Sequence, residues 1–162
     1  AEQQRAEEVK DFISEIFRQA NAYQDGSPRL PATELLARAD QRIDQSFAQR
    51  PEVRAELRLL VAESLQSLQD NARAAVIAAK ALADAQRTLG PDHPRTLAAA
   101  SVHLNLRYLK EPNETVYAGY QDLLARMRRV REVDPAYQVH ALQYAAGLAM
   151  ALEKNDEAES LY

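Results

Sequence analysis

The sequence of 162 residues has no cysteine and only four glycines. The absence of cysteine excludes disulfides and thiolate metal sites, and it leaves the redox compartment open. Asn-Gly hairpin turns and alternating runs of valine, isoleucine and threonine are also missing, so β structure has no support in the pattern. No apolar run reaches the ~18 residues that a membrane-spanning helix needs. We therefore expect an all-α fold.

The charge balance favours neither nucleic acid nor direct membrane insertion. Lysine and arginine number 20 against 24 acidic residues, a net charge of −4, so the basic excess of most nucleic-acid and anionic-membrane binders is lacking. The apolar fraction of 46% suits one compact domain or one stretch of a repeat array. The first residues are charged, unlike a signal peptide, and both ends have helical patterns, so we expect a piece of a longer protein.

Apolar residues recur at steps of three and four along most of the chain, which predicts amphipathic helices. The polar breaks between them divide the pattern into seven helices and the start of an eighth. The predicted ranges are about 2–22, 31–48, 51–68, 72–89, 94–110 and 114–132, then a seventh helix that starts at "DPAY" and includes "ALQYAAGLAMAL", and a truncated helix after about 156.

The apolar faces of the first three predicted helices give the candidate core. The first carries Val9, Phe12, Ile13, Ile16, Phe17 and Ala20, the second carries Leu35, Leu36, Ala39, Ile43 and Phe47, and the third carries Val53, Leu57, Leu60, Val61, Leu65 and Leu68. The fourth is rich in alanine, so we expect its neighbours to approach closely.

Residues at the breaks predict how individual helices begin and end. Asn71 is a candidate N-cap because its side-chain oxygen can accept a bond from a free amide of the first turn. Gly90 suits a left-handed conformation after the fourth helix, and Pro94 suits the first turn of the fifth. Asp92 and His93 stand between them and could pair as an acid-base or metal motif. Adjacent turn residues seldom converge on one substrate atom, so we interpret both as connector.

A repeat is visible in the alternation of helix and turn. Ala74 and Ala158 each follow an asparagine-containing break and lie 84 residues apart, which is twice a period of about 42. Here the sequence resembles the tetratricopeptide repeat in the longer form of kinesin light chains. Its small-residue positions match Ala62, Ala74 and Ala81 in one pair and Ala146 and Ala158 in another, and "LGPDHP" matches its connector.

The middle pair departs from this family pattern, since Asn105, Tyr117 and Leu124 occupy the small-residue positions. The resemblance nevertheless implies a right-handed α-α superhelix of about seven to eight helices. Residues 51–162 would form tetratricopeptide-like helical pairs, the last of them truncated, and residues 1–48 an N-terminal helical hairpin or cap.

The first fifty residues carry a second resemblance. "RAEEVKDFISEIFRQAN" and the helices after it look like the segment that follows the transmembrane helix in bacterial serine/threonine protein kinases with carboxy-terminal tetratricopeptide repeats. The resemblance implies a membrane tether and a kinase domain upstream, with this region in the periplasm. Related segments follow winged-helix transcriptional regulators, so a cytoplasmic repeat region and a free-standing adaptor are the alternatives.

In such an array the first helix of each pair lines a concave face that can take a peptide or partner protein. The repeat register places there Glu56, Leu59, Glu63 and Gln66 of the third helix and His140, Gln143 and Met150 of the seventh. The fifth helix contributes Val102, Leu106 and Leu109 in the preferred register, or His103 and Arg107 if the register slips by one. This mixture suits a basic or amphipathic peptide; a spacer or a homodimerising element is the alternative.

Catalytic, cofactor and metal sites have weaker support. His103 and His140 could share a groove, but no His-x-x-x-His or Glu-x-x-His spacing supplies a third metal ligand. There is no Gly-x-Ser-x-Gly motif and no kinase signature. The basic run 126–131 spreads over more than one helical face, which indicates a solvated surface. We expect a non-enzymatic interaction or sensory region without cofactor or metal; a hydrolase or metal enzyme on a helical bundle is the rival.

Overall fold

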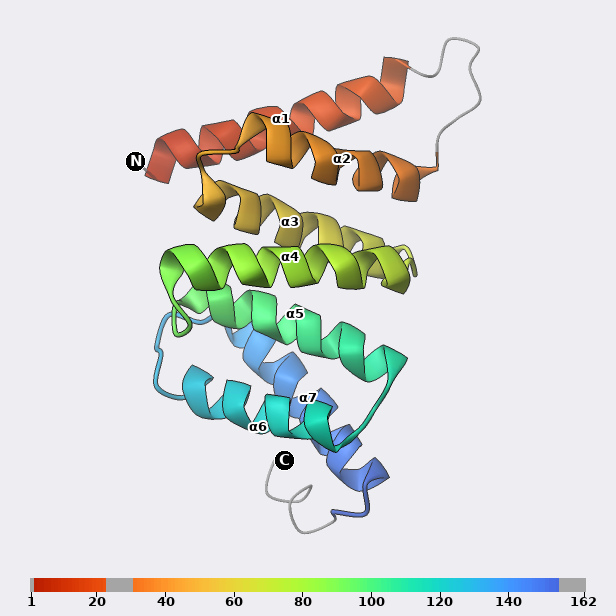
Figure 1. Ribbon diagram of the computed structural model, residues 1–162, viewed down its shortest axis with the longest axis vertical. Helices are drawn as coiled ribbons and strands as arrows, with labels where there is room; N and C mark the ends of the chain where they lie inside the picture. The colour runs from red at the N-terminus through yellow and green to blue at the C-terminus, as the bar shows by residue number, and fades with distance from the viewer. Residues whose placement is uncertain (1, 23–30, 155–162) are drawn as a thin grey trace.

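The computed structural model describes residues 2–22 and 31–154, and these form seven helices and no strand. The fold is all-α, as predicted (Figure 1). The helices are α1 (Glu2–Ala22), α2 (Ala32–Ser46), α3 (Pro51–Ser67), α4 (Asn71–Leu89), α5 (Pro94–Lys110), α6 (Glu114–Met127) and α7 (Pro135–Ala151).

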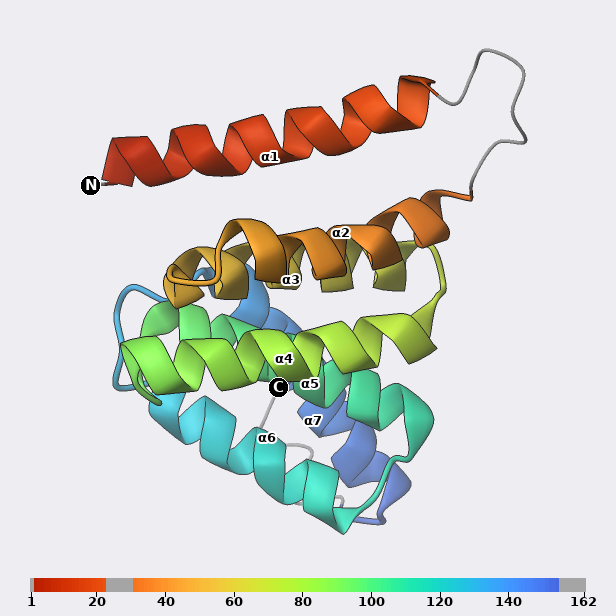
Figure 2. The ribbon, with the colours of Figure 1, turned by 45° about the horizontal axis from the view of Figure 1, so that its top comes forward.

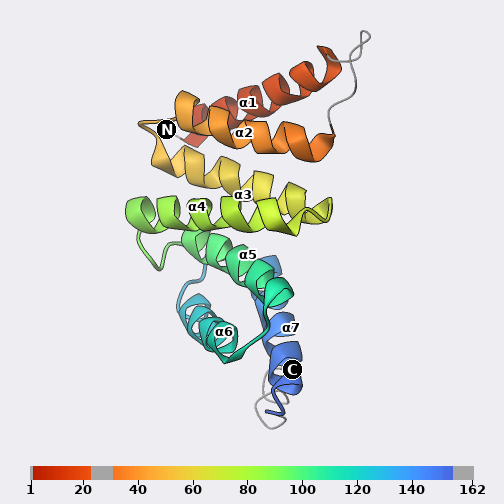
Figure 3. The same cartoon turned by 45° about the vertical axis from the view of Figure 1, so that its right-hand side comes forward.

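The helices pack in the order of the sequence. Each helix contacts the next one, and α3 also contacts α1 and α5, while α5 also contacts α7. Figure 3 shows α6 and α7 side by side below α5, and Figure 2 shows α1 as the outermost helix, beyond α2. The odd-numbered helices α3, α5 and α7 therefore form a contiguous row.

Two apolar clusters make up the core, and α5 contributes to both. Leu97 and Leu104 pack with α6 and α7, whereas Val102 and Leu106 pack with the helices from α1 to α4. The close approach expected of α4 is present, since Ala74, Ala78 and Ala81 are fully buried. The candidate core was correct at Ala39, Ile43, Val53, Leu57, Val61 and Leu65, which are buried, and at Phe12, Leu36 and Phe47, which pack in the same cluster.

Two leucines of the predicted core are exposed instead. Leu60 is 41% exposed and Leu68 is 48% exposed. The buried residues of α3 follow i, i+4 steps through Val53, Leu57, Val61 and Leu65, and the two exposed leucines lie to one side of that stripe. The side chains of the predicted core residues 17 and 20, and the predicted eighth helix, lie outside the described residues.

The sixth helix ends at Met127, not at residue 132 as predicted. The amides of Arg128 and Val130 bond to the carbonyls of Leu124 and Met127 in a closing turn. The chain then bends so that Val133 is buried and Val130 packs against the same cluster, which a continued helix would not have achieved. Only the first arginine of the run 126–131 is therefore helical.

The helix starts differ from the prediction at α2 and α4. Pro31, predicted in the first turn of the second helix, is the N-cap of α2, which begins at Ala32. Asp70, not Asn71, is the N-cap of α4: its Oδ1 accepts a bond from the amide of Arg73 at 3.2 Å. Pro94 occupies the first turn of α5, as predicted. Gly90 has a positive φ of 86°, but its ψ of 165° is extended and not left-handed helical.

Candidate functional site

A cavity of about 260 Å³ lies where α3, α5 and the start of α7 meet, beside the end of α4. Its walls are mainly apolar, with Leu59 and Leu60 from α3, Ala98 and Ala99 from α5, and Tyr137 from the first turn of α7. The cavity forms because the small side chains of α5 leave a gap between two helices that otherwise touch.

Among the described residues, four carboxylates and one guanidinium line this cavity. Glu56 and Glu63 come from α3, Glu132 and Asp134 from the turn before α7, and Arg95 from the first turn of α5. The lining thus carries an excess of negative charge over apolar walls. A carboxylate facing a low-dielectric wall attracts a cation more strongly than one in open water does.

Two of the carboxylates hold the walls together. Arg95 Nη1 lies 3.3 Å from Oε2 of Glu56 and joins α5 to α3. The hydroxyl of Tyr137 donates to Oε1 of Glu63 over 2.7 Å and joins α7 to α3. Burial, and then the bond to Glu63, raises the pKa of Tyr137, so this phenol stays a donor throughout the physiological range. Ser101 Oγ, 3.4 Å from the carbonyl oxygen of Tyr137, adds a contact from α5.

Three of the four predicted binding residues of α3 line the cavity, namely Glu56, Leu59 and Glu63. Gln66 is half-buried and lies one helical turn beyond Glu63, outside the cavity. These three are the only predicted binding residues that line the cavity.

On α5 the cavity is lined by Pro94, Arg95, Ala98 and Ala99, and by none of the residues predicted in either register. Val102, Leu106 and Leu109, predicted in the preferred register, do not line it. Val102 is buried in the core, while Leu109 is 47% exposed beyond the cavity. The other residue of that register, at position 106, is also buried.

His103 and Arg107 lie on the next face of α5 and do not line the cavity. His103 is half-buried, and its Nδ1 has no hydrogen-bond partner among the described residues. Burial, and then the charge of Arg107, lowers the pKa of His103. Arg107 is exposed.

On α7 the sequence missed the residue that lines the cavity. Tyr137 was not singled out because an aromatic side chain in a first helical turn has the same pattern as a core residue. His140 is exposed and three positions further along, so it lies on the neighbouring part of the same side of α7. Gln143 and Met150 are also exposed and lie outside the cavity.

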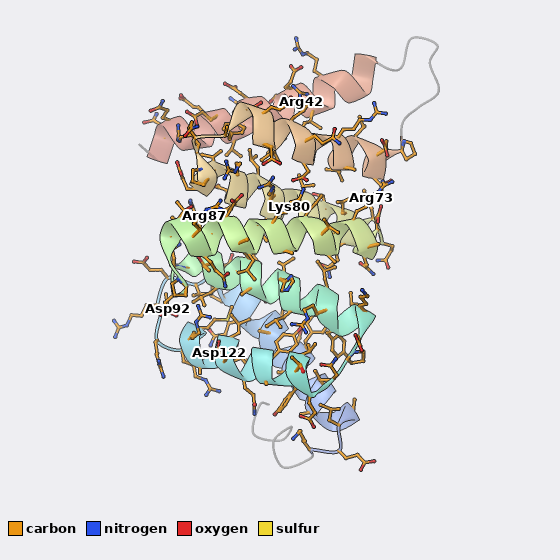
Figure 4. The ribbon with its side chains drawn as sticks, in the orientation of Figure 1. Arg42, Arg73, Lys80, Arg87, Asp92 and Asp122 are labelled. Atoms are coloured by element: carbon orange, nitrogen blue, oxygen red, sulfur yellow. The ribbon has the colours of Figure 1, made fainter. Side chains whose placement is uncertain are left out.

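Asp92 and His93 point to different partners. Nδ1 of His93 accepts a bond from the amide of Arg95 at 3.2 Å and caps α5. Asp92 Oδ1 accepts from Nε of Arg126 over 2.8 Å, and the same guanidinium also binds Asp122, so the two carboxylates lie near one another (Figure 4). The partner of His93 thus lies in α5 and that of Asp92 in α6.

A second cavity, of about 350 Å³, lies under α1 and is lined almost entirely by apolar side chains. Phe12, Ile13 and Ile16 of α1 face Leu36 of α2 and Leu57 of α3 across it. The sequence predicted the apolar stripe of α1 but gave no sign that its packing against the next helices leaves space.

An ion cluster centred on a buried arginine joins α2, α3 and α4. Arg58 of α3 donates to Asp40 and Asp44 of α2 over 2.8 and 2.5 Å, and to Asp84 of α4 over 2.5 Å. Arg54 lies a further 3.1 Å from Asp84.

Two exposed bases of α4 extend this cluster. Lys80 lies 2.5 Å from Asp40, and Arg87 pairs with Asp84; both bases project from α4 (Figure 4). Burial alone would raise the pKa of Asp40 and of Asp84. The hydrogen bonds and charges of Lys80 and Arg58 at Asp40, and those of Arg54 and Arg58 at Asp84, together outweigh burial and hold both pKa values below their ordinary range.

Within residues 2–22 and 31–154, no three histidine or acidic side chains are grouped so that they could hold a metal ion. None of the helices in that part of the chain is both long and apolar enough to cross a bilayer. No family model matches the chain, and no curated protein matches it closely enough to be called a relative.

Proposed function

We propose that this chain is a protein-docking module built as a short right-handed superhelix of tetratricopeptide-like pairs. The pairs would be α3 with α4 and α5 with α6, followed by α7. Contacts of α5 with both α3 and α7 support this proposal, because the first helices of successive pairs stack directly in such an array. The helical repeat pattern of the sequence supports it independently.

The cavity between α3, α5 and α7 is the observation that carries the docking function. It lies on the face shared by the three helices that would be first in their pairs, where such arrays take their ligands. Its volume of about 260 Å³ is below the ~300–1,000 Å³ of small-molecule sites. That size suits one or two side chains of a larger partner better than a free small molecule.

The proposed role is non-enzymatic, within a bacterial signalling protein. The resemblance of residues 1–48 to the segment after the membrane span of serine/threonine kinases is the basis for placing the module in the periplasmic, sensory part of such a kinase. The reading frame upstream of residue 1 tests this context. A membrane span preceded by a kinase domain supports it, and a winged-helix domain contradicts it in favour of a transcriptional regulator.

Selection from a phage-displayed library of random peptides tests docking at the cavity. A Leu59→Trp variant fills the cavity from its α3 wall, and Val76→Trp is the control because Val76 is 59% exposed on α4 and lies outside the cavity. We expect selected peptides to bind the wild type and Val76→Trp equally and to lose most affinity for Leu59→Trp. Peptides that bind all three proteins alike, or a selection that yields none, would exclude the cavity as a docking site.

A further inference from the structure

We propose that the cavity between α3, α5 and α7 takes a lysine or arginine side chain of the partner, its stem against the apolar walls and its charge among the carboxylates. This inference rests on the docking function proposed above and deepens it by naming the chemistry of the partner. Apolar side chains form most of the cavity lining, and acidic side chains supply most of its charge.

The walls fit an aliphatic stem. Leu59 and Leu60 of α3 line the cavity together with the small residues Ala98 and Ala99 of α5, so its sides are apolar. Long basic side chains bury their methylene groups on such surfaces while the charged end stays among polar groups. A carboxylate-bearing side chain has a shorter stem and would bring its charge against the acids of the cavity.

The charges fit a cation. Four carboxylates line the cavity against the single guanidinium of Arg95, and that guanidinium is engaged by Glu56. A carboxylate offers about four lone-pair sites, and the one bond from Tyr137 leaves further acceptor positions on Glu63. Glu132 also lines the cavity and is exposed.

The net charge of the protein has the same sign as the charge of the cavity lining. The chain as a whole carries a net charge of −4, so its field attracts a basic segment toward the cavity and repels an acidic one. Arg131 precedes Glu132 in the turn before α7, but it lies outside the cavity lining. Arg131 therefore does not contribute a positive charge to the lining itself.

Binding of three matched synthetic peptides, followed by fluorescence anisotropy, tests the proposal. The peptides share their length and their leucines and alanines, and differ only in carrying lysine, glutamine or glutamate at the remaining positions. We expect the lysine peptide to bind the wild type about tenfold more tightly than the glutamine peptide, since hydrogen bonds to charged groups exceed neutral ones by about that factor. The glutamate peptide should bind most weakly.

Two double variants separate the cavity from the overall charge. Glu63→Gln with Glu132→Gln removes two carboxylates of the cavity and keeps an acceptor for Tyr137. Glu7→Gln with Glu111→Gln removes two exposed carboxylates outside it, so both variants have the same net charge. We expect the lysine preference to fall to about twofold or less in the first and to persist in the second. Helical circular dichroism checks that both are folded.

Equal binding of the lysine and glutamine peptides, or a lysine preference that survives in the cavity variant, would overturn the inference. The failure of the docking function itself has a different signature. If phage selection yields peptides that depend on Leu59 but lack basic residues, docking at the cavity stands and only the basic partner is wrong. If no selected peptide depends on Leu59, both proposals fall together.

Discussion

Arg58 on α3 donates through Nη1 to Oδ2 of Asp84 on α4 over 2.5 Å, and the two side chains are only 5% and 7% exposed. The same guanidinium reaches Asp40 of α2 through Nε, so one buried cation lies between carboxylates of two other helices. Removing either partner of a buried pair leaves an uncompensated charge, which costs far more than losing an exposed pair. The cluster therefore fixes how α2 packs on the pair α3 and α4.

Replacing Arg58 with methionine should lower the free energy of unfolding by about 3 kcal/mol, because Asp40 and Asp84 stay buried with fewer partners. Arg87→Met is the matched control, since the side chain of Arg87 is 66% exposed although it also pairs with Asp84. We expect the control to cost less than about 1 kcal/mol. Urea unfolding followed by circular dichroism measures both. Similar losses in the two variants would show that burial of the cluster contributes little.

The same cluster predicts sensitivity to acid. The pKa values of Asp40 and Asp84 are lowered in the folded protein. Between those values and the unfolded pKa of about 3.9, the unfolded chain binds more protons than the folded one, so stability falls as the pH falls. The stabilisation is complete above about pH 4 and is lost progressively as the pH drops through the folded pKa values.

Replacing Asp84 with asparagine should reduce stability at neutral pH and flatten its dependence on pH below about 4. Unfolding curves at a series of pH values from neutral to strongly acidic measure both effects. Because the variant lacks one of the two lowered carboxyls, its stability curve should run closer to that of the wild type at low pH than at neutral pH. If stability depended on pH in the same way in the variant and the wild type, the pKa of Asp84 would not be lowered in the folded protein.

The ion cluster also shows where reasoning from the sequence stops. The helix pattern follows from local periodicity, and it placed the starts of α3, α5 and α6 at the observed residues. Which charged residues become buried depends on the neighbour of each helix, and Arg58 and Asp84 lie 26 residues apart in the chain. Neither stands out from other charges on amphipathic helices.

The candidate site also combines residues that the local sequence pattern predicts with residues that only the tertiary packing brings there. Glu56, Leu59 and Glu63 could be predicted together because their spacing of three, four and seven places them on one side of a helix. Tyr137 could not, because its contact with Glu63 spans 74 residues and depends on how α7 crosses α3. The end of α6 also escaped prediction, since the chain there bends to bury Val133, and burial of that residue is a property of the tertiary packing.

The N-cap of α4 gives a test with two adjacent residues. The carboxylate of Asp70 accepts the amide of Arg73, whereas Asn71 is the first helical residue and its buried Oδ1 has no partner among the described residues. Asp70→Ala should lower the free energy of unfolding by about 1 kcal/mol, and Asn71→Ala should change it by less than about 0.5 kcal/mol. Thermal and urea unfolding measure both. A larger loss of stability in Asn71→Ala than in Asp70→Ala would show that Asn71 is the N-cap.

Two helical glycines lie at contacts of different tightness. In the pair α5 and α6, a Cβ at Gly119 would lie 2.8 Å from Cδ2 of Leu104, which is itself only 8% exposed. In α7, the nearest atom to a Cβ at Gly147 is the hydroxyl of Tyr108 at 3.9 Å, an ordinary contact distance. Gly119 therefore allows α5 and α6 to approach closely at Leu104.

Alanine at these two positions should have opposite effects on stability. Alanine favours a helix over glycine by about 1 kcal/mol, and this gain should appear at Gly147 as a stabilisation of about 0.5–1 kcal/mol. At Gly119 the displaced Leu104 adds an overpacking cost of about 1–3 kcal/mol, so we expect a net loss of about 1 kcal/mol.

Shortening Leu104 to alanine in the Gly119→Ala background should relieve the clash, so that the second substitution costs less there than in the wild type. Urea unfolding of the four variants measures the difference. Stabilisation by Gly119→Ala, or equal costs of Leu104→Ala in both backgrounds, would show that α5 and α6 have room to spare and that the glycine is not what allows their close approach.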